Sequence, residues 1–265
     1  MVAFRCPCLG SRYFQIPVLK EILPHWMPDD FVDTLACLLF ICGVKTIFII
    51  ATKHVLEHFN LNFAAIKPPH KKWYVLTHLS KVLLLLFIAL SSNHFLDMYR
   101  MYSDSFPSFG KRRAAIFVAN NVVALYMPQK ISRSTAIHHL AAVIILILVM
   151  LHNLDAKGWT GTLGAAKMSC FYGMILSCAF SAQAYLGLRV IYPKAIWLKG
   201  FLRVTLWIDC VCFVLNCCMH GLWIASLVSS GQVSLSTFLY MILLVIAVYD
   251  DIVLLRWLKK RCKNN

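Results

Sequence analysis

The sequence predicts an all-α, polytopic membrane protein with about seven transmembrane helices. Of its 265 residues, 60% are hydrophobic and only 14% are charged, whereas soluble domains carry about 25% charged residues. The hydrophobic residues are gathered in long runs, and a membrane span needs about 20 apolar residues. A soluble fold of this size could not bury so much apolar surface, so the runs predict membrane-spanning helices.

Seven apolar segments are candidate spans. In chain order they cover residues 31–52, 73–93, 114–128, 136–152, 168–188, 203–228 and 235–257. The third segment is short for a span and the fourth is marginal. Pro128 ends the third segment and residues 129–135 form a tight link, so we expect these two segments to form a helical hairpin.

The chain shows no repeat, linker or second domain, so we expect one membrane domain over residues 31–258. Residues 1–30 contain charged residues and four prolines without a continuous apolar core, which predicts an N-terminal segment that does not span. Residues 259–265 form a basic tail, which we expect in the cytosol.

The basic residues predict an orientation rather than a nucleic-acid partner. The formal net charge is +15, and most Lys and Arg lie between the apolar runs or at the C-terminus. Nucleic-acid binding would need a basic face on a soluble domain, which this sequence lacks. Lys and Arg are more frequent in 53–72, 129–135, 189–203 and the tail than in the alternate connections. The positive-inside rule therefore predicts a lumenal N-terminus and a cytosolic C-terminus.

The sixth segment carries polar residues on one helical face. Asp209, Phe213, Asn216 and His220 follow one another at steps of four, three and four residues. Polar groups at membrane depth are costly and normally face a protein interior. We interpret the stripe as the lining of a cavity, with a satisfied packing network as the alternative.

A histidine pair, His138-His139, opens the fourth segment. Adjacent side chains on a helix diverge by about 100°, and neither histidine has a metal-binding partner four residues on, so we predict no metal site. One histidine could face a cavity as an acid, base or hydrogen-bonding group while the other braces a neighbouring helix. A purely structural role stays open.

Other polar residues in the spans suggest packing or membrane-edge roles. We expect Lys45 to pair with Asp209, Asp250 or Asp251, or to snorkel, and Lys81 to snorkel from its helix end. Asp250-Asp251 resembles a membrane-edge charge pattern. In the fifth segment, small residues recur every four positions, which favours close helix packing; they are Ser169, Gly173, Ser177 and Ser181.

Taken together, four elements resemble the TLC-domain family over roughly residues 35–260. This family includes ceramide synthases, translocon-associated TRAM proteins and smaller regulators of membrane lipids. The elements are a basic-aromatic entry to a span, a double histidine, a segment ending in arginine and an acidic last span with a basic exit. They lie at Lys71-Lys72-Trp73, Ile137-His138-His139, Phe180–Arg189 and Asp250-Asp251 with Trp257–Lys260.

The resemblance implies a TLC-like bundle of six helices around a central, lipid-accessible cavity, with one additional N-terminal helix. It implies a multi-pass protein of the endoplasmic reticulum or a connected membrane. The residues that we expect to bind substrate at the polar end of this cavity are Asn120, Asn121, Asp209, Asn216 and His220. Membrane lipids are the expected partners, and a homo-oligomer or a complex with endoplasmic-reticulum membrane proteins stays open.

Three functions are compatible with these observations. The leading hypothesis is a membrane-embedded protein of lipid binding or lipid homeostasis that acts on acyl chains, sphingolipids or phospholipids. The second is ceramide-synthase-like N-acyl transfer with acyl-CoA as co-substrate, no other cofactor, and His138 or His139 as catalytic base. It ranks second because Asn120-Asn121 and Phe180 replace acidic residues of the family pattern. The third is a seven-helix receptor or a cargo or translocation factor.

Overall fold

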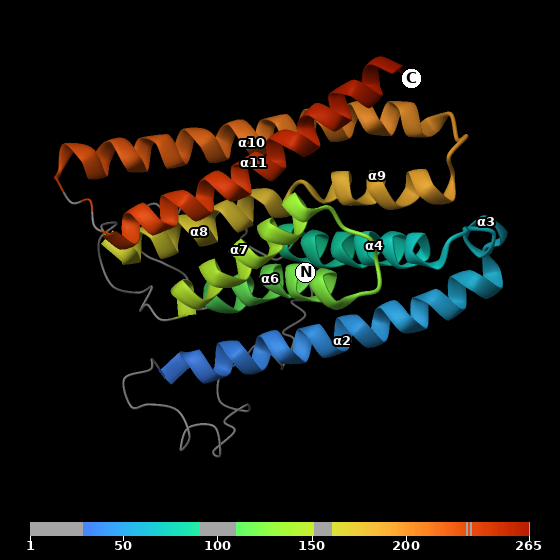
Figure 1. Ribbon diagram of the computed structural model, residues 1–265, viewed down its shortest axis with the longest axis horizontal. Helices are drawn as coiled ribbons and strands as arrows, with labels where there is room; N and C mark the ends of the chain where they lie inside the picture. The colour runs from blue at the N-terminus through green and yellow to red at the C-terminus, as the bar shows by residue number, and fades with distance from the viewer. Residues whose placement is uncertain (1–28, 91–109, 151–160, 232, 234, 265) are drawn as a thin grey trace, which may run out of the picture.

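The computed structural model describes residues 29–90, 110–150, 161–231, 233 and 235–264, and all regular structure in this part is helical. The helices are α2 (Asp29–Phe59), α3 (Leu61–Ala64), α4 (Pro69–Leu90), α6 (Gly110–Tyr126), α7 (Arg133–Met150), α8 (Gly161–Ser177), α9 (Phe180–Ile191), α10 (Trp197–Ser229) and α11 (Leu235–Asn264) (Figure 1). The predicted all-α class is confirmed. Residues 1–28 of the predicted N-terminal segment lie outside the described residues.

Five of the described helices are long and apolar enough to cross a membrane, and the bent pair α8–α9 would make a sixth. The chain is therefore a polytopic membrane protein, and its described residues hold fewer full-length spans than the seven predicted. The difference lies in α6, whose apolar part, Ala114–Tyr126, is too short to span by length. This segment, predicted at 114–128, is the one whose apolar run is already short for a span in the sequence.

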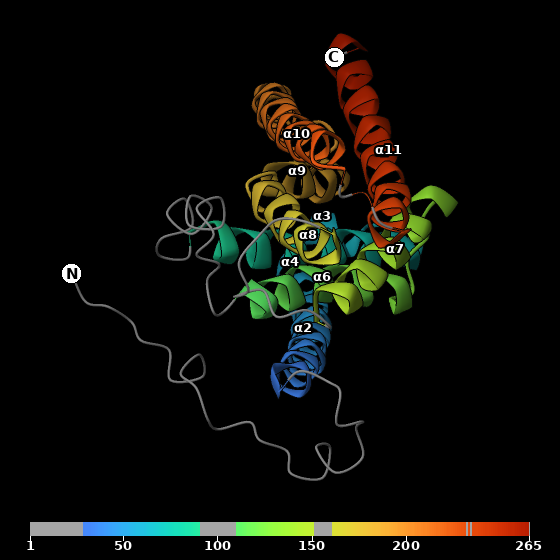
Figure 2. The same ribbon diagram turned by 90° about the vertical axis from the view of Figure 1, so that its left-hand side faces the viewer.

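Helices α2 and α10 run close to the long axis of the molecule, α7 and α11 cross it obliquely, and the helices stack in layers (Figure 1, Figure 2). Helix α2 lies on one side, where it packs against α6 and α4; α10 and α11 lie on the opposite side, against α9 and α7. Helix α4 packs closely along α9. At their contact, a Cβ added to Gly187 would lie 3.1 Å from Leu79 Cδ2, so a glycine there allows the close approach.

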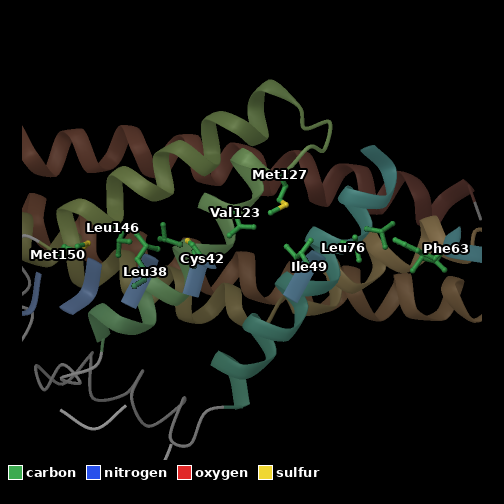
Figure 3. Packing of buried hydrophobic residues seen from close by; sticks show 14 residues of the cluster. Leu38, Cys42, Ile49, Phe63, Leu76, Val123, Met127, Leu146 and Met150 are labelled. Carbon is green, nitrogen blue, oxygen red and sulfur yellow. The ribbon is translucent and has the colours of Figure 1, made fainter. Parts of the chain in front are cut away.

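Buried apolar side chains hold α2 onto the bundle (Figure 3). Leu38, Cys42 and Ile49 of α2 pack with Val123 of α6 and Leu146 of α7 in one cluster. The outer helix faces carry exposed large apolar side chains, among them Ile47 on α2 and Trp207 on α10. An apolar exterior of this kind suits lipid contact.

The predicted hairpin is present between α6 and α7. Helix α6 ends at Tyr126, two residues before Pro128, and α7 begins at Arg133. The Ser132 hydroxyl accepts a hydrogen bond from the Thr135 backbone N–H at 3.1 Å, which caps the start of α7.

The predicted span 168–188 is not one continuous helix. The chain breaks after Ser177, and α8 and α9 meet at 47°. At the break the Cys178 and Ala179 N–H groups donate to carbonyls three residues back, and Ser177 Oγ donates to the Met174 carbonyl at 2.7 Å. Such local hydrogen bonds compete with the regular helical pattern and bend the chain.

Candidate functional site

A polar cavity of about 400 Å³ lies among α4, α6, α7, α8, α9, α10 and α11. Helix α2 contributes no residue to its lining, so α2 stands outside the ring of helices around it. Side chains of both charges line the polar cavity. Those most relevant to function are His78, Lys81, Lys130, His138, His139, Gln183, Arg189, Asp209, Asp250 and Asp251.

Helix α4 supplies one wall of the polar cavity through Tyr74, His78, Lys81 and Leu85. Their spacing of four, three and four residues places them on one face of the helix. His78 Nδ1 lies 2.6 Å from Gln183 Oε1 of α9, which joins the two helices at the cavity wall. Lys81 therefore points inward, and the expectation that it snorkels to the helix end is wrong.

The opposite wall, on α11, carries the two acids Asp250 and Asp251. Both lie within electrostatic range of Lys81. Thr135 Oγ1 donates to Asp250 Oδ1 at 3.5 Å, and the Tyr172 hydroxyl donates to Asp251. These acids, expected as a charge pattern at the membrane edge, are thus part of the cavity wall.

Both histidines of the pair line the polar cavity. The rings of His138 and His139 meet edge to face with centroids 5.6 Å apart, although their side chains leave the helix in different directions. Among the described residues, neither Nδ1 atom has a hydrogen-bond partner. His138 lies within electrostatic range of Asp250, and His139 is buried.

Two members of the α10 stripe line the polar cavity, the acidic Asp209 and the apolar Phe213. Asp209 is 6% exposed, and within the described part of the chain neither carboxylate oxygen has a hydrogen-bond partner. A buried carboxylate without a partner is costly, because it has lost its hydration without gaining hydrogen bonds.

The two C-terminal members of the stripe, Asn216 and His220, lie elsewhere. Asn216 and His220 line neither of the two interior cavities. His220 Nδ1 lies 2.8 Å from the Asn216 carbonyl, and its Nε2 lies 2.9 Å from the Tyr240 hydroxyl of α11. His220 therefore joins α10 to α11, while the Asn216 side-chain amide has no partner among the described residues.

The asparagine pair also lies apart from the cavity wall. Asn120 and Asn121 are almost fully buried, and neither lines an interior cavity. Asn120 Oδ1 accepts a hydrogen bond from Lys45 Nζ of α2. The partner of Lys45 is thus an amide rather than Asp209, Asp250 or Asp251. Asn120 thus provides an acceptor for the cation of Lys45, which is buried between α2 and α6.

An apolar slot of about 70 Å³ adjoins the polar cavity. The two cavities share His138 and Phe117, which therefore stand at their junction. Apolar side chains such as Ile88, Leu146 and Val149 line most of the slot. A cavity with charged side chains in its wall, next to a narrow apolar slot, matches the two ends of an amphiphile.

Sequence reasoning missed His78, Gln183, Arg189 and the α11 acids as cavity residues and misplaced Lys81. A signal for α4 was available, because its polar face repeats the spacing of the α10 stripe. The sequence indicated a place in the cavity less clearly for Gln183 and Arg189. Helix α9 is amphipathic, but its polar residues are of the kind found at the ends of helices. Within the described residues, no group of three or more His, Cys, Asp or Glu side chains could hold a metal ion.

The fold and the cavities define the class: an all-α, multi-pass membrane protein with a polar cavity inside its helix bundle. No protein-family model, curated protein or solved structure matches the chain.

Proposed function

We propose that this protein binds a membrane lipid inside its helix bundle and serves lipid homeostasis, as its resemblance to TLC-domain proteins also suggests. One observation carries the proposal: the polar cavity and the apolar slot meet at His138 and Phe117. A lipid headgroup would occupy the former and part of its acyl chain the latter. The endoplasmic reticulum or a connected membrane is the proposed location.

Unpartnered polar atoms in the cavity wall support the headgroup site. Asp209, His139 Nδ1 and Arg189 Nε have no hydrogen-bond partner among the described residues. Each of these groups pays a desolvation cost of about 1–3 kcal/mol, and more for a charged group, unless something bonds to it. A headgroup with both donors and acceptors would satisfy them, because the wall holds cations and acids together.

Native mass spectrometry of the purified full-length protein tests this proposal. We expect lipid to co-purify, and we expect its loss when Asp209 and His139 are replaced together by Asn and Gln. Lipidomics of cells that lack the protein should show a changed acyl composition of sphingolipids or phospholipids. A protein that carries no lipid, in cells whose lipids are unchanged by its removal, would contradict the proposal.

One observation favours N-acyl transfer as a second candidate. Asp250 of α11 lies within electrostatic range of His138, so it could take the place of the family carboxylate that is absent beside the histidines in sequence. In this reaction an amine attacks an acyl-CoA thioester, so that a C–N bond forms, the C–S bond breaks and coenzyme A leaves as the thiol. His138 or His139 would take the amine proton, and Asp250 would stabilise the resulting imidazolium.

An assay with acyl-CoA and sphinganine separates this candidate from lipid binding alone. We expect the purified wild type to form ceramide, the variant H138A/H139A to be inactive, and D250N to be slowed. Equal product formation by wild type and the double variant would eliminate a histidine-dependent reaction.

A further inference from the structure

A third cavity, of about 490 Å³, lies where α9 passes into α10. We call it the basic mouth and define it by Tyr185, Arg189, Lys194, Lys199 and Arg261, which line it with a few apolar residues. No acidic residue lines the basic mouth in the described structure. The α9–α10 link and the C-terminal end of α11 lie at the same end of the bundle (Figure 1).

The basic mouth is linked to the polar cavity by Arg189, which lines both. The Arg189 guanidinium lies 4.5 Å from the centre of the Trp257 ring, and the Arg261 guanidinium lies 5.4 Å from it. Contacts of this kind with an aromatic face hold cations in place. Trp257 thus positions one arginine from α9 and one from α11 beside the same cavity.

We propose that the basic mouth binds phosphate groups. Four cationic side chains converge on one hollow, from α9, the α9–α10 link, α10 and α11, and a bound anion would offset the repulsion between these like charges. Arginine binds phosphate through paired, charge-assisted hydrogen bonds, and lysine adds a mobile point charge. Basic residues at a cytosolic membrane edge also attract headgroups in general. A hollow that shares Arg189 with the polar cavity goes beyond that general attraction.

The order of the three cavities indicates which kind of ligand would fit them. Arg189 connects the basic mouth to the polar cavity, and His138 connects the polar cavity to the apolar slot. A molecule with phosphate at one end and a hydrocarbon chain at the other would fit this order. The phosphate could belong to a phospholipid headgroup or to a soluble phosphorylated molecule. The inference does not depend on the proposed lipid binding, because three of the four cations of the mouth are exposed and do not line the polar cavity, namely Lys194, Lys199 and Arg261.

Binding to the full-length protein in phosphatidylcholine nanodiscs tests the inference. One arm titrates pyrophosphate by calorimetry, and the other measures retained phosphatidic acid by native mass spectrometry. We expect K194Q/K199Q and R261Q to weaken binding by about tenfold, as expected for the loss of charge-assisted hydrogen bonds. The matched control is K259Q/K260Q, which removes two exposed charges beside Arg261 that do not line the mouth.

The outcomes distinguish a soluble phosphate ligand, a lipid headgroup and the absence of a phosphate site. Pyrophosphate binding that falls in the mouth variants and not in the control identifies a soluble phosphate source. Retention of phosphatidic acid with the same dependence, without pyrophosphate binding, identifies a lipid headgroup. If neither probe binds, or if the control variant weakens binding as much as the mouth variants, the charges act as a general membrane anchor and the inference is overturned. Since Lys194, Lys199 and Arg261 are exposed, size-exclusion profiles should show that these variants fold.

Discussion

At the scale of single residues, buried polar atoms without partners fall into two groups. Asp209, His138 and His139 lie in the wall of the polar cavity, where a ligand can reach them. Asn121 and Thr205 are equally buried but line neither interior cavity. Only the first group can regain hydrogen bonds from a bound ligand. We therefore expect changes to these residues to alter both the stability of the protein and its ligand binding.

Replacing Asp209 by Asn should stabilise the empty protein and weaken lipid retention. The amide has the same shape but removes an unpaired buried charge, which is costly to keep. A gain of about 1 kcal/mol would raise the melting temperature by about 2–4 °C in a chain of this size. Thermal unfolding and native mass spectrometry of the same preparation measure the two effects.

Thr205→Val is the matched control for this change. Thr205 lies one helical turn before Asp209, is fully buried and has an unpartnered hydroxyl in the described structure. Its replacement should raise stability slightly and leave lipid retention unchanged. If D209N neither stabilises the protein nor alters retention, Asp209 has no role in the site.

At the scale of helices, the contact between α8 and α6 shapes the apolar slot. Gly173 of α8 lines the slot, and a Cβ added to it would stand 3.5 Å from the Phe117 ring, at an ordinary contact distance. The small-residue stripe predicted for packing therefore also borders a cavity. Ser177 from the same stripe bends the chain at the end of α8.

Gly173→Leu should partly fill the slot and shift co-purified lipids towards shorter acyl chains. Gly173 lines the slot, and the first added carbon would contact Phe117 on its wall. Gly43→Leu is the control, since a Cβ at Gly43 on α2 meets nothing within 4 Å. Both changes raise helix propensity by about 1 kcal/mol, so only the slot differs between them. An unchanged chain-length profile in G173L would show that the slot holds no acyl chain.

The contact between α2 and α6 contains, besides its apolar cluster, the buried pair of Lys45 and Asn120. K45M leaves Asn120 without its partner, and N120L leaves a buried ammonium without an acceptor, so each single change should destabilise the protein. The double variant K45M/N120L should recover part of the loss, with a coupling of about 1–3 kcal/mol. Unfolding midpoints in detergent measure the cycle, and additive single effects would show that the pair contributes nothing.

At the scale of the whole molecule, the basic connections gather at one end of the bundle. The end of α2, the α9–α10 link and the C-terminus lie towards that end (Figure 1). This grouping agrees with the connections that the positive-inside rule assigns to the cytosol. It also places the basic mouth on that side of the proposed orientation.

A glycosylation reporter should detect this orientation. The native sequence contains no Asn-x-Ser/Thr acceptor, so one added site produces one clear mass shift. We expect glycosylation of an acceptor on an extension before Met1 and none of an acceptor on an extension after Asn265. The reverse pattern would show that the orientation is inverted and the basic mouth lumenal.

The sequence alone determined the membrane class and the approximate position of most long helices. Hydrophobic run length and proline placement are local properties, so α4, α7 and α10 occur close to the ranges predicted for them. The bend between α8 and α9 was missed because it depends on a local choice of hydrogen bonds that small residues permit but do not require.

Only the tertiary structure decided which polar residues share a cavity. Helical spacing tells which residues lie on one face, but the neighbour of that face depends on how each helix is rotated and packed. Asp209 and His138 therefore line one cavity with Lys81 and Asp250 from two further helices, while Asn120 lies against Lys45 instead. The burial of a polar side chain could be predicted from the chain, but its partner could not, because partners come from helices distant in sequence.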